Sequence, residues 1–520
     1  MDKLTKPELP DGKSPVLSEE QMAESLKRRD MGYRLFQTYP LSSPMVGGLV
    51  IAIFGIAAYS LLWGDHAELV LAAIFLLGLA IASLVVPIEW LLMMNVVAFI
   101  LADTYFDLRG LNYQYTRFVP LGMFAIRALL PSTLRRVRGY MLPGFFLKPF
   151  GLFFLMALFS ATYDKLDPGA TLQRALTMGF MLVAFGVGLP AYLTDDRRLR
   201  RGLHGILAVL GLSIVMGWIA IPLESRVFFH VGDYSRVRGI YNHPNTLGLM
   251  AMLTFFPVFG WRLETPRGKR WPFTIILFAL LMAILTSGSR ASFVGLVMGA
   301  IVFLRFRPLN TRGKVFLILL CVFAFTMLFG LPHVLPGMLR TDTGWRFELW
   351  QRALHLGQES PLLGSGFGST GHVFSDDRPL LTRQGVYAGG SHNEYARIFV
   401  GMGAIGLFLA LLGFGWVLFK AVRVIRAEKN PVIPVSLLAA VIGGLTNAIF
   451  EDWIFAFGGA PAFPFWFFLA FLAIYGHRRT LLWKNSLRHY LMRRNYSSKI
   501  DLQATKKDKS LLNKPNPLPH

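Results

Sequence analysis

Long apolar runs alternate with short polar segments from position 44 to position 477. The runs are about 17 to 25 residues long, the length that an α-helix needs to cross roughly 30 Å of hydrocarbon. This pattern predicts an all-α, polytopic membrane helical bundle. The third and fourth runs are the weakest, which gives twelve to fourteen transmembrane helices. The expected spans are 44–62, 68–86, 88–103, 116–130, 145–162, 172–193, 202–221, 245–261, 272–287, 289–305, 315–331, 392–420, 431–450 and 460–477.

Polar segments flank the apolar region and interrupt it once at length. Residues 1–43 and 478–520 form polar tails, 44–477 form the transmembrane domain, and 332–391 form a large external loop before the last three spans. No short apolar stretch with a small-residue cleavage site precedes the first span, so we expect no cleavable signal peptide and a cytoplasmic N-terminus. From His477 onward the chain holds eleven Lys or Arg against two Asp, which favours a cytoplasmic C-terminus.

Positive charge follows the alternation expected of membrane loops. Basic loops such as "TDDRRLRRG", "WRLETPRGKRW" and "KAVRVIRAEKN" fall on the side of both termini, which the positive-inside rule makes cytoplasmic. These loops and anionic lipid head groups explain the net charge of +23, so nucleic acid is not an expected partner. With 54% hydrophobic and 16% charged residues, a soluble protein is excluded. The single cysteine, Cys321, excludes a disulfide framework.

Four segments on the opposite side hold nearly every polar residue that could do chemistry. They are 222–244, 286–292, 332–391 and 450–461. Arg226, Arg236 and Arg238 lie in the first segment, where positive charge is normally depleted, and Arg290 lies in the second. Each arginine could pair with a nearby acid or reach a lipid head group. Alternatively they form an anion site, because two guanidinium groups can hold a pyrophosphate without a metal.

The large loop contains the segment "TDTGWRFELWQRALHLGQ", with apolar residues on roughly one face. This pattern predicts an amphipathic helix at the external membrane surface that carries Trp345, Arg346 and Trp350. A lid packed on the bundle is the alternative. The following "GSGFGS", Gly364–Ser369, resembles a phosphate-cradling loop but lacks the lysine that should follow it, so we reject a P-loop.

His392 stands in "GGSHNEY", directly before an apolar run. A histidine in a transmembrane region is most often a satisfied hydrogen-bonding partner or a metal ligand. Here Ser391 is a plausible N-cap, and the positive end of the following helix would lower the imidazole pKa and favour a neutral base. Neutral imidazole can accept a proton from a hydroxyl near pH 7. Asn393 and Glu394 could orient the ring or bind sugar hydroxyls.

The external histidines and aspartates do not show metal-ligand spacing. No pair has the i, i+4 or short-loop spacing of zinc ligands, and no Asp-x-Asp occurs in an external loop. We therefore expect no metal and no cofactor, which leaves the arginines to neutralise any anionic leaving group.

Four blocks, in this order, resemble the superfamily of bacterial O-antigen ligases and O-antigen polymerases. They are "SRVRGIYNHPNTLGLMAML", "LTSGSRASFVGLVMG", "GWRFELWQRALHLGQESPLLGSGFGS" and "GGSHNEYARIFVGMGAIGL". The resemblance is densest over residues 234–415. It implies a fold like that of C-class glycosyltransferases, a place in the bacterial plasma (inner) membrane with the active site on the periplasmic or external side, and a metal-independent role in cell-envelope polysaccharide or lipopolysaccharide biosynthesis.

The resemblance also implies substrates and site residues. The donor would be a glycan on undecaprenyl pyrophosphate, and the acceptor would be a hydroxyl of a glycan or of a lipid A-core-type molecule. Matched by motif, His392 would accept the acceptor's proton. Arg238 and Arg290, with Arg236 beside them, would hold the donor pyrophosphate. Direct attack would invert the anomeric centre.

Arg346, Trp345 and Trp350 would close over the sugar and exclude water. Two alternatives stay open: a polymerase, whose acceptor is a second lipid-linked glycan, and a polysaccharide transporter with His392 as a proton relay. A transporter predicts charges at mid-membrane depth and internal symmetry, whereas here the polar residues cluster at external ends and no repeat is visible.

Overall fold

The computed structural model describes residues 87–104, 118–136, 142–193, 196–219, 229–230, 233–307, 311–329, 344–371, 390–428 and 430–481. The chain divides into two compact units, Met1–Val85 and Val86–His520. Every described residue belongs to the second unit. The expected spans 44–62 and 68–86, the N-terminal tail and most of the C-terminal tail lie outside the described residues, and the predicted domain bounds remain a prediction.

Each expected span from position 88 onward coincides with a helix. The helices are α4 (Ile88–Ala102), α6 (Phe118–Leu129), α8 (Gly144–Ser160), α9 (Pro168–Val183), α11 (Asp196–Ile219), α13 (Pro244–Glu264), α14 (Trp271–Ser287), α15 (Arg290–Phe306), α16 (Thr311–Phe329), α21 (Glu394–Ala427), α22 (Val432–Asn447) and a last helix over 462–481. Among the described residues, four helices are long and apolar enough to cross a membrane, namely Pro168–Tyr192, Arg197–Ile219, Pro244–Glu264 and Glu394–Ala427. The chain is an all-α polytopic membrane protein, as the hydropathy pattern predicts.

Smaller elements complete the described part. The helix α7 spans Pro131–Arg136, the 3-10 turn η3 spans Arg267–Lys269, and α9 continues through a π-helical turn, η2 (Ala184–Gly188), into α10 (Leu189–Tyr192). Two short antiparallel strands, β1 (Phe229–His230) and β2 (Asp233–Val237), lie in the segment expected to be external. The amphipathic helix predicted in the large loop is α18 (Gly344–Glu359).

Glycines let α13, α15 and α22 approach closely. A Cβ atom on Gly295 of α15 would lie 2.7 Å from the carbonyl oxygen of Gly443 of α22. One turn further along α15, a Cβ on Gly299 would collide with the ring of Phe256. Small residues one turn apart are the usual means by which membrane helices pack backbone against backbone. This packing fixes where α22 ends, and hence where the turn at 450–461 begins.

The helix α21 is broken at Gly403, where the sequence predicts a continuous span. Gly403 has φ 62° and ψ −169°, a conformation that a side chain disfavours. The segment 361–366 fills the break, because the N–H of Ala404 donates to the carbonyl of Pro361 at 2.8 Å and the N–H of Gly366 donates to the carbonyl of Gly401 at 2.9 Å. Irregular backbone inside a membrane bundle requires such internal partners. A segment from the middle of the large loop is therefore built into α21.

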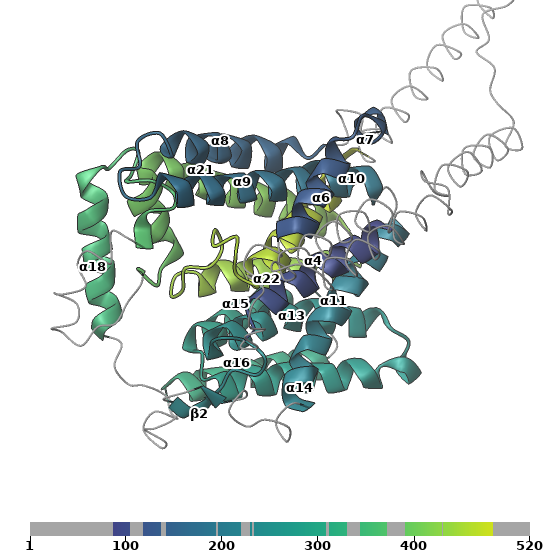
Figure 1. Ribbon diagram of the computed structural model, residues 1–520. Helices are drawn as coiled ribbons and strands as arrows, with labels where there is room; N and C mark the ends of the chain where they lie inside the picture. The colour runs from purple at the N-terminus through teal and green to yellow at the C-terminus, as the bar shows by residue number, and fades with distance from the viewer. Residues whose placement is uncertain are drawn as a thin grey trace, which may run out of the picture. The chain divides into compact units, whose positions relative to one another are not determined.

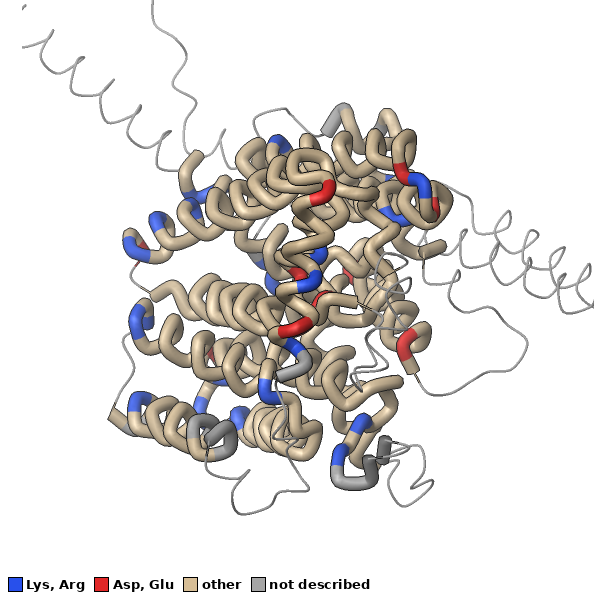
Figure 2. Tube along the Cα trace, turned by 90° about the vertical axis from the view of Figure 1, so that its left-hand side faces the viewer, with Lys and Arg blue, Asp and Glu red and all other residues tan. Residues whose placement is uncertain are grey.

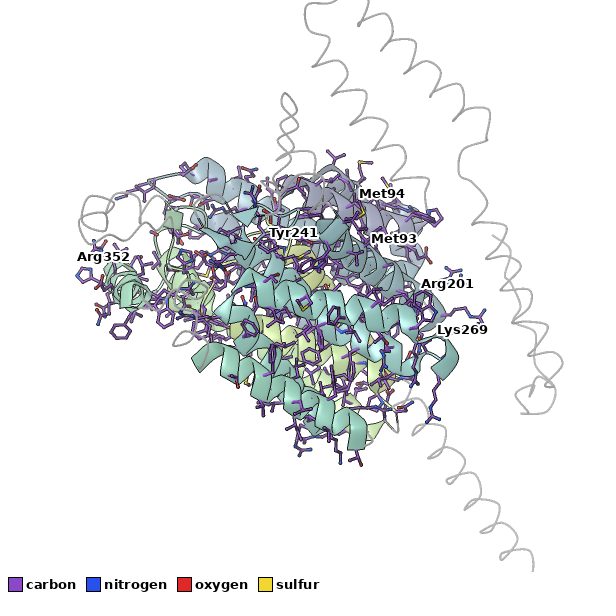
Figure 3. The ribbon with its side chains drawn as sticks, turned by 90° about the horizontal axis from the view of Figure 1, so that it is seen from below. Met93, Met94, Arg201, Tyr241, Lys269 and Arg352 are labelled. Carbon is purple, nitrogen blue, oxygen red and sulfur yellow. The ribbon has the colours of Figure 1, made fainter. Side chains whose placement is uncertain are left out.

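The helices α8, α9 and α21 run side by side, and α22 lies between them and the group α13 to α16 (Figure 1). Arg201 and Lys269, from two of the loops predicted to be cytoplasmic, lie at one end of the bundle, whereas Arg352 of α18 lies at the other end (Figure 3). These two basic loops and α18 thus lie at opposite ends of the described part, as the predicted alternation requires.

We expect Gly295→Ala to destabilise the protein by about 2 kcal/mol, because a methyl group must displace the Gly443 carbonyl. Thermal unfolding in detergent should show a lower transition temperature. Gly151→Ala, on α8, is the matched control, because a Cβ there has no atom within 4 Å. Equal transition temperatures for the two variants would contradict close packing of α15 on α22.

Candidate active site

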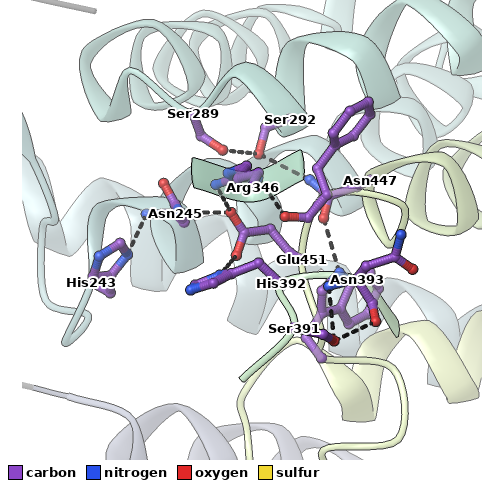
Figure 4. Close-up of polar contacts among 12 residues, drawn as sticks. His243, Asn245, Ser289, Ser292, Arg346, Ser391, His392, Asn393, Asn447 and Glu451 are labelled. Carbon is purple, nitrogen blue, oxygen red and sulfur yellow. Dashed lines mark hydrogen bonds and ion pairs between the residues drawn. The ribbon is translucent and has the colours of Figure 1, made fainter. Parts of the chain in front are cut away.

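The carboxylate of Glu451 is the centre of the polar site. It lies after α22 and accepts hydrogen bonds from Arg346 of α18 at 2.9 Å and from the side-chain amide of Asn245, at the start of α13, at 2.8 Å. Nδ1 of His392, just before α21, lies 3.2 Å from its second oxygen. The Glu451 side chain is only 13% exposed. Four segments that are far apart in sequence therefore meet at one buried carboxylate (Figure 4).

Local capping holds His392 in place. The side chain of Asn393 caps α21 by accepting the N–H groups of Tyr395 and Ala396 at 3.0 and 3.1 Å. His392 itself has φ 45° and is the one non-glycine residue with positive φ in the described part of the chain. Strained backbone of this kind persists where the surroundings impose it, and it is frequent at functional sites.

The carboxylate of Glu451 decides the protonation of His392. Glu451 is an acceptor, so Nδ1 of His392 carries the hydrogen and Nε2 is left as the second ring nitrogen. Burial lowers the pKa of His392, but the hydrogen bond to Glu451, its charge and that of Asp452 raise the pKa by more, to above its ordinary value. The prediction that the helix end lowers this pKa is therefore wrong.

The pKa of Glu451 shifts in the opposite direction to that of His392. Burial raises the pKa of Glu451, but the hydrogen bond from His392 and the positive charge of Arg346 lower the pKa by more. The group is therefore a carboxylate at neutral pH. Arg346 also donates to the carbonyl of Phe450 at 2.5 Å, which fixes the guanidinium beside the turn.

Two of the predicted anion-binding arginines lie next to this centre. Arg236, on β2, donates to the side-chain carbonyl of Asn245 at 2.5 Å and to the backbone carbonyl of Ser287 at 2.8 Å. Arg290, the first residue of α15, has a buried Nη2 with no hydrogen-bond partner in the described part of the chain. The charges of Arg290 and Arg346 lie close enough to repel each other. This grouping of cations suits an anion.

Arg238 occupies a different environment. It follows β2 directly, its side chain is buried with 3% exposure, and its carbonyl accepts the N–H of Tyr241. The half-buried Arg236 and Arg290 are thus more open to an incoming ligand than Arg238. The role predicted for Arg238 stays a prediction.

Glu394 has a structural environment. Its side chain is fully buried, pairs with Arg397 at 2.5 Å and accepts the N–H of Ile454 at 2.7 Å. Asn393, as the N-cap, is engaged with the backbone of α21. Both residues therefore hold the turns around His392, and their predicted contact with sugar hydroxyls remains untested.

The helix α18 presents Arg346 and Trp350, one turn apart, toward the turn that follows α22. The ring of Trp350 lies 6.1 Å from that of Phe450, and its indole Nε1 is buried without a partner among the described residues. The side chain of Trp345 lies outside the described residues. Leu349 and Ala353 of the same helix pack on Val400 of α21, which fixes α18 against the bundle.

A second set of polar contacts adjoins the site (Figure 4). The hydroxyls of Ser289 and Ser292 lie 2.9 Å apart, and Asn447 links Ser292 to the indole of Trp453. Charged residues gather in the middle of the molecule among helices that otherwise carry few charges (Figure 2). Within the described ranges, no group of three or more His, Cys, Asp or Glu residues could hold a metal ion.

Sequence reasoning missed Glu451 and Asn245. The acidic "FEDWIF" turn lies in the expected external segment 450–461, but the sequence alone assigns no role to its carboxylates. One signal could have indicated Glu451. The other external segments hold several arginines and a histidine, and such cations need a counter-ion when they are buried. The residues around Asn245 indicate only the start of a helix, and nothing in them indicates a contact with the site.

The chain was compared with known proteins. No curated protein matches the chain. A family model described as O-antigen ligase matches residues 273–411. The matched part runs from α14 into α21 and includes Arg290, Arg346 and His392, whereas Glu451 lies outside it. Residues 273–411 are thus similar to the O-antigen ligase family.

Proposed function

We propose that this protein is a metal-independent, inverting glycosyltransferase. It moves a glycan from an undecaprenyl-pyrophosphate carrier to an acceptor hydroxyl on the external face of the bacterial plasma membrane. The observation that carries the proposal is the 3.2 Å pairing of His392 with Glu451 beside the arginine group of Arg236, Arg290 and Arg346. A base and an anion site are the two parts that such a transfer needs.

His392 acts as the general base. Glu451 accepts from Nδ1, which leaves Nε2 to take the proton of the acceptor hydroxyl, and the carboxylate stabilises the imidazolium that forms. The acceptor oxygen forms a bond to the anomeric carbon while the bond from that carbon to the pyrophosphate oxygen breaks. Undecaprenyl pyrophosphate leaves with the electron pair, and the anomeric centre inverts.

The arginines stabilise the leaving group. Negative charge grows on the pyrophosphate as the bond breaks, and fixed cations aimed at that charge lower the barrier. Arg290 has an unpartnered Nη2 and is available for a phosphate oxygen. Arg236 and Arg238 hold the rest of the diphosphate, and α18 closes over the sugar with Trp345 and Trp350 and excludes water.

The first test is transfer by purified protein in detergent, with EDTA present, from an undecaprenyl-pyrophosphate glycan pool to a panel of acceptors. We expect His392→Ala to lose transfer while the protein still folds, because Glu451 keeps Arg346 and Asn245 as partners. His355→Ala is the matched control, because His355 is exposed on α18 (66% of its side chain) and should keep wild-type activity.

Each outcome of this assay has a distinct meaning. Glycan on a non-prenyl acceptor, with release of undecaprenyl pyrophosphate, supports the ligase. Longer lipid-linked chains instead identify an O-antigen or exopolysaccharide polymerase. Absence of transfer with every acceptor, combined with flux of lipid-linked glycan in vesicles, would replace the enzyme with a transporter, and inhibition by EDTA would contradict metal independence.

Glu451→Gln should change the pH dependence of transfer. Glu451 raises the pKa of His392, so its removal lowers that pKa, and the acidic limb of kcat/KM moves to lower pH. The plateau should fall by about 100-fold, because an amide does not stabilise the imidazolium. Glu348→Gln, on the exposed face of α18, is the control. If the acidic limb of kcat/KM stayed at the same pH in Glu451→Gln, His392 would not be the base whose titration produces it.

Arg290→Lys should weaken donor use. Lysine keeps the charge but loses the planar fork that matches two phosphate oxygens. We expect kcat/KM for the donor to fall roughly 10-fold, and a titration of donor at saturating acceptor measures it. Wild-type kinetics in this variant would argue against bidentate recognition of the pyrophosphate by Arg290.

A further inference from the structure

Arg174 is the single charged residue of α9, in the sequence "PGATLQRALTMGFMLV". It lies on the face that packs into the bundle, since Thr171 and Met178, about one turn away on either side, are fully buried. Arg174 lies about 10 Å along the helix axis from the first residue of α9. An arginine on the inner face of a candidate membrane span is costly to keep and is generally functional.

In the described part of the chain, the half-buried guanidinium of Arg174 makes no hydrogen bond and no ion pair. The acids whose charges act on it are Asp167, Glu394 and Asp452. Glu394 is occupied by Arg397 and by the N–H of Ile454. Asp167 caps α9 by accepting the N–H of Ala170 at 2.8 Å.

Asp452 connects Arg174 to the active site. Its charge acts on Arg174 and on His392, and a Cβ on Gly390 would lie 2.6 Å from one of its oxygens. Burial raises the pKa of Asp452, so this carboxyl is a weak counter-ion. The positive charge of Arg397 also acts on Arg174 and repels it.

The cations near the site belong to two groups of helices, with α22 between them (Figure 1). Arg346, from α18, acts on Glu451 and His392, whereas Arg290 and Arg236 belong to α15 and β2, beside α13 and α14. Arg174 belongs to α9, on the side of α8 and α21 (Figure 1). In an inverting transfer the leaving group and the attacking hydroxyl occupy opposite faces of the sugar. The leaving pyrophosphate fits the first group, so the second lies toward the acceptor.

We propose that Arg174 binds an oxyanion, either a phosphate or a carboxylate, carried by the acceptor glycan. Its five N–H donors, which have no partner among the residues that the structure describes, suit such a group. The acceptor would enter between α9 and the turn at 450–461, with its anionic substituent on Arg174 and its hydroxyl toward His392. This inference rests on the glycosyltransferase proposed above and specifies the chemical class of the acceptor.

The test compares wild type, Arg174→Gln and Arg174→Lys with a phosphorylated core glycolipid, with the same glycolipid after phosphatase treatment, and with a carboxylated glycan before and after reduction of its carboxyl groups. We expect Arg174→Gln to raise the acceptor KM about tenfold for the native anionic acceptor. The KM for the donor and kcat at saturating acceptor should stay unchanged, and Arg174→Lys should recover part of the loss. In wild type, removal of the group that Arg174 binds should raise the acceptor KM as Arg174→Gln does. A rise after phosphatase treatment identifies phosphate, and a rise after reduction of the carboxyl groups identifies carboxylate.

Binding of fluorescently labelled acceptor without donor gives a second readout. Weaker binding to Arg174→Gln, with no transfer by any variant, would support the anion subsite while rejecting the transferase. A rise in the donor KM alone would place Arg174 on the pyrophosphate, and equal losses with anionic and neutral acceptors would overturn the proposal. Arg197→Gln, exposed on α11, is the control for loss of a positive charge. If Arg174→Gln fails to fold, the acceptor KM of Arg174→Lys is compared between anionic and neutral acceptors, and a rise with the anionic acceptor alone supports the proposal.

Discussion

The buried carboxylate of Glu451 is the group on which the site depends. A carboxylate taken out of water is destabilising unless charged and polar partners replace the lost hydration. Arg346, Asn245 and His392 supply those partners from three other segments. The same contacts that make the buried charge tolerable also bring the loop helix, the start of α13 and the start of α21 together. Removal of the carboxylate would leave Arg346 without its counter-ion and would lower the pKa of the neighbouring His392.

Two packing features set the distance between His392 and Glu451. Glu451 follows α22, whose position depends on the backbone contact between Gly443 and Gly295. His392 precedes the first half of α21, which is held at its far end by the segment 361–366 in the break at Gly403. A shift of either helix by a fraction of a turn would separate the ring from the carboxylate. The close helix packing thus serves the geometry of the base as well as stability.

Features set by local sequence could be predicted, and features set by distant partners could not. The helices from α4 onward follow from apolar length, and α18 follows from its amphipathic pattern. The break at Gly403 depends on Pro361 and Gly366, which come from another loop. The helix dipole alone suggested a lowered pKa for His392, but a carboxylate 59 residues away in sequence overrides it. The role of Asn245, 206 residues from Glu451, is likewise invisible before folding.

The arginines near the site divide by whether the protein itself neutralises them. Arg346 and Arg397 pair with Glu451 and Glu394, so most of their charge is used to hold the fold. Arg290 and Arg174 make no ion pair within the described residues, and desolvation without a counter-ion destabilises both. A bound anion would relieve that penalty at each position. Arg290 belongs to the group α13 to α16 and Arg174 to the group of α8, α9 and α21, with α22 between the two groups, so in the proposed transfer one anionic group from each substrate would neutralise the two positions.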